Sequence, residues 1–278
     1  MATVYATDQV LLFGGLSSYA TGNPLSDDWL WSGSTGGWTI VAGTGPSGRF
    51  GHAMAELSGT GGVVLFGGST LSYTGLLADT WVFNGTSWST VTATGPVSRY
   101  HHAMAGDLTR GVAVLFGGYG GGAYRNDTWE FSGTAWANRT PTSGSPGVRY
   151  GHAMAFDAGR NVTVLFGGWN ASSLLSDTWE WNGSSWTQRF PSNSPPARDI
   201  TSMVYDQERG LITIFGGSSG LGDEWTWDGT NWTQQTAARP TSRMGTSMAF
   251  DPITFAPMIF GGITSSMGTT LGDTWMRY

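Results

Sequence analysis

The sequence predicts an all-β domain in which one four-stranded unit occurs six times. Phe-Gly-Gly recurs six times at spacings of 45 to 53 residues, and an Asp-x-Trp follows each Gly pair. No segment shows a sustained apolar period of 3.6 residues, which argues against helices. A repeat of this length is typical of a β-propeller, in which neighbouring sheets bury one another's apolar faces. The six phenylalanines are Phe13, Phe66, Phe116, Phe166, Phe215 and Phe260.

The fourth unit shows the four strands expected in each repeat. The first strand is residues 151–156, and the second, residues 162–166, is a short apolar run of the kind that is buried on both faces. The third is residues 178–181, and the fourth begins near Trp186. Asn182-Gly183 separates the last two strands and is a strong hairpin signal.

The repeats divide the chain evenly, so we expect a single domain over residues 1–278. The expected blades cover approximately residues 1–45, 46–95, 96–144, 145–194, 195–239 and 240–278. The chain begins inside a first strand and ends inside a third strand, which predicts 23 strands and a last blade without its outer strand. We expect a monomer, with association through the unpaired strand edge as the alternative.

The Gly pair that ends the second strand and the aromatic residues of the third and fourth strands resemble kelch repeats of the bacterial type. This resemblance covers essentially the whole chain. WD40 repeats are the nearest competitor, but they have a shorter period and a Trp-Asp dipeptide. The resemblance implies a six-bladed kelch-type propeller with four antiparallel strands per blade, and recognition of a ligand at the rim that carries the long loops.

Composition excludes several classes of partner and site. The net charge of −6 argues against nucleic acid and against an anionic membrane surface. Cys is absent, which excludes disulfides, thiolate metal sites and a Cys nucleophile. No apolar run approaches 18 residues, and residues 1–5 lack the features of a secretory signal. If the parent protein is extracellular or displayed on the cell surface, its export signal lies outside this chain.

The loops between the second and third strands vary most, and we expect them all at one rim. The strands of a blade alternate in direction, so these loops, the Gly pairs and the Asp of Asp-x-Trp share that rim. Loops on a rigid scaffold are where recognition is expected. Five aromatic residues in these loops predict a platform for peptides or sugars, with packing of the loops on themselves as the alternative. They are Tyr19, Tyr73, Tyr119, Tyr124 and Trp169.

One Arg precedes the first strand in five of the six units. These residues are Arg49, Arg99, Arg149, Arg198 and Arg243. As a ring of guanidinium groups at the channel mouth they would bind a carboxylate or phosphate. The alternative is a structural Arg–Asp pair repeated in each blade, because the Asp of Asp-x-Trp lies on the same rim.

His52, His102 and His152 occupy one position in three consecutive units, and Met1 is assigned to that position in the first unit. If the first strand is innermost, the three imidazoles could converge on a zinc or copper ion. Gly-His belongs to the ordinary kelch pattern, however, so the favoured interpretation is a hydrogen-bonded structural His. We expect no cofactor.

These patterns favour a binding scaffold over an enzyme. The sequence has no nucleophile elbow, P-loop or His-Glu-x-x-His motif, and the copper chemistry of galactose oxidase, a kelch-related enzyme, requires a Cys. We therefore expect a module that recognises a protein, peptide or glycan at the loop-rich rim. A metal-binding or copper-oxidase-like propeller enzyme and a structural or engineered propeller without a ligand are the alternatives.

Overall fold

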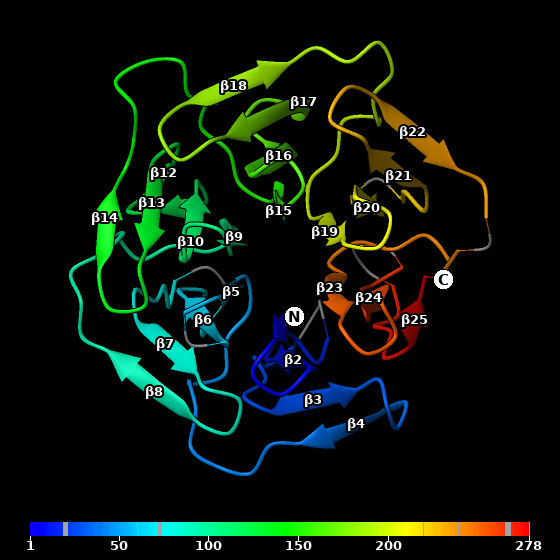
Figure 1. Ribbon diagram of the computed structural model, residues 1–278. Helices are drawn as coiled ribbons and strands as arrows, with labels where there is room; N and C mark the ends of the chain where they lie inside the picture. Colours follow the sequence, from blue (N-terminus) through cyan, green and yellow to red (C-terminus); the bar gives the residue numbers. More distant parts are fainter. Residues whose placement is uncertain are drawn as a thin grey trace.

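The computed structural model describes residues 1–18, 22–59, 61–71, 74–218, 220–237, 239–264 and 268–277. Within these ranges the chain forms strands and turns but no helix, and six sheets stand like blades around a central channel (Figure 1). The prediction of an all-β, six-bladed propeller is confirmed. None of the described segments is a helix long and apolar enough to span a lipid bilayer.

Each blade is a sheet of strands that are consecutive along the chain. Blade 1 contains β1 (Ala2–Val4), β2 (Gln9–Phe13), β3 (Asp28–Ser32) and β4 (Gly37–Ile40). Blade 2 contains β5 (Ala53–Leu57), β6 (Gly62–Phe66), β7 (Thr80–Phe83) and β8 (Trp88–Val91). Blade 3 contains β9 (Ala103–Asp107), β10 (Val112–Phe116), β13 (Thr128–Phe131) and β14 (Trp136–Asn138).

The remaining blades follow the same order. Blade 4 contains β15 (Ala153–Asp157), β16 (Val162–Trp169), β17 (Leu174–Trp181) and β18 (Trp186–Arg189). Blade 5 contains β19 (Ser202–Asp206), β20 (Leu211–Phe215), β21 (Glu224–Trp227) and β22 (Trp232–Gln235). Blade 6 contains β23 (Ser247–Asp251), β24 (Ala256–Phe260) and β25 (Thr274–Met276), so its described residues form three strands.

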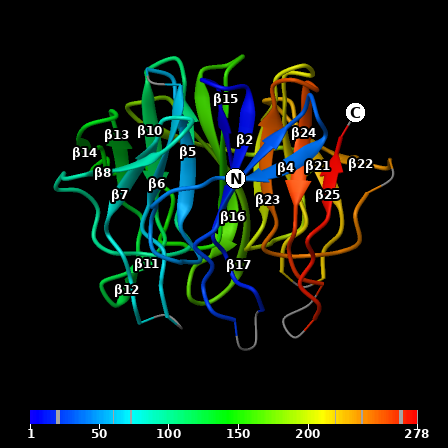
Figure 2. The same ribbon diagram turned by 90° about the horizontal axis from the view of Figure 1, so that it is seen from below.

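The first strand of each blade lies at the channel, and the chain runs outward from it (Figure 1). The loops between the second and third strands gather at one rim, and the shorter turns lie at the other (Figure 2). In blade 3 the long loop forms a two-stranded hairpin of β11 (Tyr119–Gly120) and β12 (Ala123–Tyr124), which the repeat pattern does not predict. In blade 4 the loop extends β16 and β17 instead, with Trp169 paired to Leu174.

The core lies between blades rather than within one. The Phe of Phe-Gly-Gly packs against the fourth-strand Trp of a neighbouring blade, as Phe66 does with Trp136, whose ring centroid is 5.1 Å away. The Trp136 indole nitrogen then donates to the Thr80 hydroxyl at 2.9 Å. This arrangement explains why both residue types recur with the period of the blade, because each half of the contact is contributed by a different repeat.

Blades 1 and 6 close the ring without exchanging a strand. The indole nitrogen of Trp38 donates to Thr274 Oγ1 at 2.9 Å, and the Thr3 hydroxyl donates to the carbonyl oxygen of Phe250 at 2.6 Å. The Trp38 and Phe260 rings pack edge-on with centroids 5.2 Å apart. The closing interface therefore uses the same Phe–Trp contact as four of the other five interfaces. The described residues of blade 6 include no fourth-strand Trp to pack on Phe215 of blade 5.

The strand register corrects the position assigned to Met1. Ala2 pairs with Leu11, and Ala55 pairs with Val64, and each partner lies two residues before the Phe of Phe-Gly-Gly. Ala2 is therefore equivalent to Ala55, and Met1 is equivalent to Met54 rather than to His52. The sequence comparison misplaced Met1 because the first blade lacks the Gly-His signature that marks the position.

Candidate functional site

The five predicted rim arginines lie beneath the surface. Each guanidinium side chain is 0 to 2% exposed and forms an ion pair with the Asp of Asp-x-Trp in its own blade. In blade 4, Arg149 donates to both carboxylate oxygens of Asp177 at 2.8 Å, to the Gly167 carbonyl at 2.9 Å and to the Gly147 carbonyl at 3.1 Å. This geometry is the structural Arg–Asp pair, whereas a role of these arginines in ligand binding stays a prediction.

The pairing changes the acidity of the aspartates. Burial alone would raise the pKa of Asp177, but the hydrogen bonds and charge of Arg149 outweigh burial and lower it. The pKa is lowered for all five partners, which are Asp79, Asp127, Asp177, Asp223 and Asp273. The carboxylates therefore stay ionised, and each pair ties the start of a first strand to the start of a third strand.

The three repeated histidines pack between blades. The rings of His52, His102 and His152 lie edge-on to the Phe of the preceding blade at centroid distances of 5.4 to 5.6 Å. Burial lowers the pKa of His52 and of His152 to about 3, so both rings are neutral at pH 7. Among the described residues no three His, Asp or Glu side chains come together as a metal site. A shared metal at these histidines stays a prediction without support from the geometry.

Aromatic side chains meet on the loop-rich rim over blades 3 and 4. Tyr119 and Tyr124 pair across the β11–β12 hairpin with ring centroids 5.1 Å apart, and Tyr124 lies 5.6 Å from Tyr150. The ring centroid of Tyr100 lies 5.8 Å from that of Tyr119, and the ring centroid of His101 lies 5.8 Å from that of Tyr150. All five are partly exposed. We call this group the tyrosine platform.

The sequence predicted part of this platform. Tyr119 and Tyr124 were expected from their place in the loop, and Trp169 lies next to the platform through a backbone bridge to Tyr150. Tyr100 and Tyr150 were missed, although each directly follows one of the repeated arginines, and that Arg-Tyr dipeptide was the available signal. Tyr19 and Tyr73 lie outside the described residues.

A chain of backbone hydrogen bonds supports the rim at the channel mouth. His101 N donates to Gly51 O, Gly151 N to His101 O, Ile200 N to Gly151 O, and Gly245 N to Ile200 O, at 2.7 to 3.0 Å. All five residues have φ between 50° and 66°, a region that non-glycine residues adopt at a cost. These bonds link the starts of five consecutive blades, so the platform rests on a fixed base.

The repeat and the fold agree with a comparison against known families. A family model described as the KLHDC2/KLHL20/DRC7 Kelch-repeats domain matches residues 1–217 of the 278. The chain belongs to the kelch-repeat family. The resemblance to kelch repeats is thereby confirmed, whereas the bacterial type of the repeats stays a prediction. No curated protein matches the sequence.

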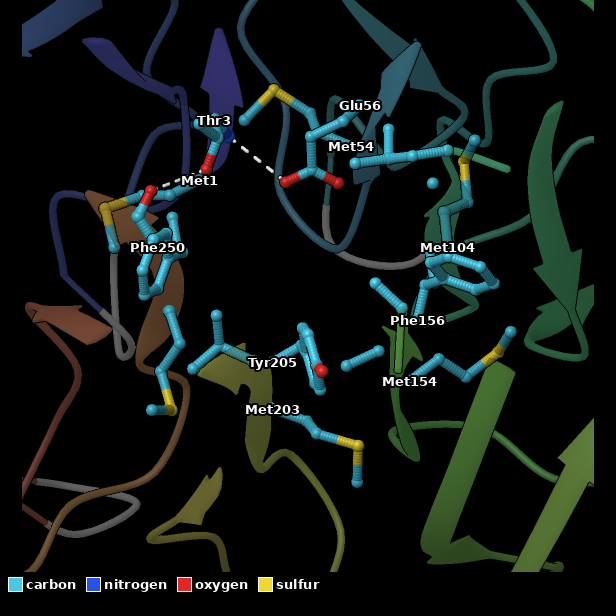
Figure 3. A pocket seen from close by; sticks show the side chains of 18 of the residues that line it. Met1, Thr3, Met54, Glu56, Met104, Met154, Phe156, Met203, Tyr205 and Phe250 are labelled. Atoms are coloured by element: carbon cyan, nitrogen blue, oxygen red, sulfur yellow. Dashed lines mark hydrogen bonds between the residues drawn. The ribbon is translucent and has the colours of Figure 1, made fainter. Parts of the chain in front are cut away.

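The kelch propeller also contains a cavity that sequence reasoning missed. It has a volume of about 120 Å³, lies within the channel and is lined by the first strands and by turn residues such as Ala158 and Gln207 at the short-turn rim (Figure 3). Six methionines line it, one at the same position in each blade. They are Met1, Met54, Met104, Met154, Met203 and Met248. The signal was present, because six of the ten Met residues recur with the period of the blade.

Proposed function

We propose that this kelch propeller is an interaction module that binds a segment of another protein on the tyrosine platform of its loop-rich rim. The observation that carries the proposal is the clustering of Tyr100, His101, Tyr119, Tyr124 and Tyr150, which are partly exposed and in mutual contact. Kelch propellers commonly serve as protein-interaction scaffolds, which agrees with this use of the rim.

The chemistry of the platform favours a neutral or apolar segment over an anionic one. The N–H groups of the five repeated arginines donate to aspartates and backbone carbonyls below the rim. Tyrosine supplies a large contact area and a hydrogen-bonding hydroxyl with only two rotatable side-chain bonds to fix. We therefore propose that the ligand places apolar or aromatic side chains on the tyrosines and pairs its backbone with the hydroxyls.

The binding surface extends beyond the five platform residues in this proposal. Trp169 adjoins Tyr150 through the backbone bridge, and Tyr19 and Tyr73 belong to the equivalent loops of blades 1 and 2. We assign the repeated arginines a supporting role, holding the strands from which these loops rise. A glycan that stacks an apolar sugar face on the tyrosines is the alternative ligand class.

The test is to screen the protein against a peptide array and a glycan array and then to measure the affinity of the selected ligand by calorimetry. Tyr124→Ala and Tyr150→Ala should each weaken binding at least about tenfold, as expected when an aromatic hot spot is truncated. Phe190→Ala is the matched control, because Phe190 is 83% exposed and follows the outer strand β18. Equal losses in the control and the platform variants would refute the proposal, and selection of glycans alone would reassign the ligand class.

A further inference from the structure

The six side chains at one level of the channel differ sharply around the ring. The register places Thr3, Glu56 and Gly106 in blades 1 to 3, each opposite the residue three before the Phe of Phe-Gly-Gly. The same level in blades 4 to 6 holds three aromatic residues, which are Phe156, Tyr205 and Phe250. One half of the cavity wall is therefore small or acidic, and the other half is aromatic.

Glu56 and Tyr205 face each other across this cavity, with Phe156 and Phe250 on its two sides (Figure 3). Blades 2 and 5 stand three positions apart in a ring of six, so the opposition follows from the topology. The carboxylate accepts a hydrogen bond from Thr3 N at 3.1 Å, which orients one of its oxygens.

Glu56 differs from the other strand glutamates in lacking an Arg partner among the residues that the structure describes. Glu130, Glu180 and Glu224 each form an ion pair with at least one Arg. Within the described part of the chain no Arg side chain lies within ion-pair distance of Glu56, and burial raises the pKa of its carboxyl group. The α-amino group of Met1 is the chain's own cation beside Glu56, and its charge lowers the pKa of the carboxyl group. Burial lowers the pKa of that amine to about 6, so it is mostly neutral at pH 7. A further cation in the cavity would therefore stabilise the ionised carboxylate.

Gly106 lies against the backbone of Glu56. A Cβ atom at Gly106 would lie 2.4 Å from the carbonyl oxygen of Glu56, so the close approach of blades 2 and 3 requires glycine here. Blade 3 therefore contributes backbone and no side chain at this level, and Glu56 packs directly against that backbone.

We propose that the channel cavity binds a small alkylammonium cation, with Glu56 as its counter-ion and the rings of Phe156, Tyr205 and Phe250 around its alkyl groups. Aromatic rings attract cations through the negative faces of their π-systems, most strongly where water is excluded. A volume of about 120 Å³ suits an occupant of this kind, since a cavity of about 150 Å³ accepts a benzene ring.

Metal cations fit this wall less well. Calcium and magnesium require six or more oxygen ligands, whereas the level of Glu56 offers one carboxylate and few other oxygens. The methionine sulfurs would suit copper(I), but the side chains belong to separate interblade clusters, as Met54, Met104 and Met154 show. The thioethers do not share one centre, so an alkylated ammonium group is the better match.

The experiment titrates the protein with tetramethylammonium and, separately, with neutral tert-butanol, which has a similar shape. We expect saturable binding of tetramethylammonium only, detected by calorimetry or by broadening of its proton resonance. Glu56→Gln should weaken binding at least about tenfold, and Tyr205→Leu roughly fivefold, whereas Tyr205→Phe should retain it because the ring remains. Glu208→Gln, which removes an exposed carboxylate from the short-turn rim, is the matched control and should bind like the wild type.

Several results would overturn the inference. They are absence of tetramethylammonium binding, equal binding of tert-butanol, equal losses in Glu208→Gln and Glu56→Gln, or uptake of silver(I) in its place, which would indicate a thioether metal site. If Glu56→Gln does not fold, the pair Tyr205→Phe and Tyr205→Leu decides, because only the second removes the ring. Tyr124→Ala should leave cation binding unchanged, so this test stands or falls separately from the proposal for the rim.

Discussion

Replacing Arg149 by Met should destabilise the propeller while leaving its exposed side chains unchanged. The Arg149 side chain is 2% exposed and makes four hydrogen bonds, two of them to Asp177. Met preserves the apolar stem but removes the cation beside Asp177, which keeps only the Trp179 indole as a side-chain donor, and it removes the Arg149 donors to two backbone carbonyls. Removing one member of a buried ion pair costs about 3–5 kcal/mol. Asp177 is 21% exposed, so water can solvate its unpaired carboxylate and reduce this cost. We therefore expect the free energy of unfolding to fall by about 3 kcal/mol.

Urea unfolding measures this loss as a lower midpoint with an unchanged slope. Arg139→Met is the matched control, because Arg139 is 55% exposed and pairs with Glu130 at 3.3 Å. Glu130 is buried but keeps its shorter ion pair with Arg110 in this variant. We therefore expect the loss of the exposed Arg139 partner to cost at most about 1 kcal/mol. If Arg149→Met and Arg139→Met shift the midpoint equally, the repeated arginines do not stabilise the fold. The alternative, that they bind a ligand, is then favoured. The double variant Arg149→Met/Asp177→Asn should recover part of the loss, since no unpaired charge then remains.

Two further outcomes follow from the ionisation of buried aspartates. The five Arg-paired aspartates have folded pKa values below their unfolded value of about 3.9, so their stabilisation is complete above that pH and is lost as the pH falls through the folded values. The melting temperature should therefore fall steeply below about pH 4, and Arg149→Met should flatten that decline. Asp28→Thr should instead stabilise the protein at pH 7 by about 1 kcal/mol, because burial raises the pKa of Asp28 and its Oδ1 has no partner among the described residues. Blades 2, 3, 4 and 6 already carry Thr at this position, and the gain should shrink as the pH falls below the folded pKa of Asp28; a lower melting temperature for the variant at pH 7 would contradict the reasoning.

The sequence was sufficient to predict the blades because each one repeats a complete set of signals. Phe-Gly-Gly requires two positive φ angles at the end of a buried strand, as at Gly167 and Gly168, and the following Trp supplies half of an interblade contact. These requirements are local and recur six times, so they are visible without knowledge of the tertiary structure. The hairpin of β11 and β12 is not repeated and was accordingly missed.

The cavity could not be predicted from the same signals, since it depends on which side chains share one level of six different strands. That level follows from the register, and the misplacement of Met1 by two residues would have put the wrong residue of blade 1 at the cavity. In the sequence Glu56 resembles any other single acid in a strand. The structure distinguishes it from the other strand glutamates, which each have an Arg partner among the described residues.

The two proposed sites lie at opposite ends of one channel, and the structure between them limits their coupling. The backbone hydrogen bonds from Gly51 through Gly245 link the blades at the rim end of the channel. The six repeated methionines that line the cavity lie between that end and the level of Glu56. Coupling would require an element between the sites that both ligands shift, and the hydrogen-bonded backbone of the rim separates Tyr124 from the cavity. We therefore expect a ligand on Tyr124 and a cation at Glu56 to bind additively, which is the relation expected of a rigid scaffold with two independent surfaces.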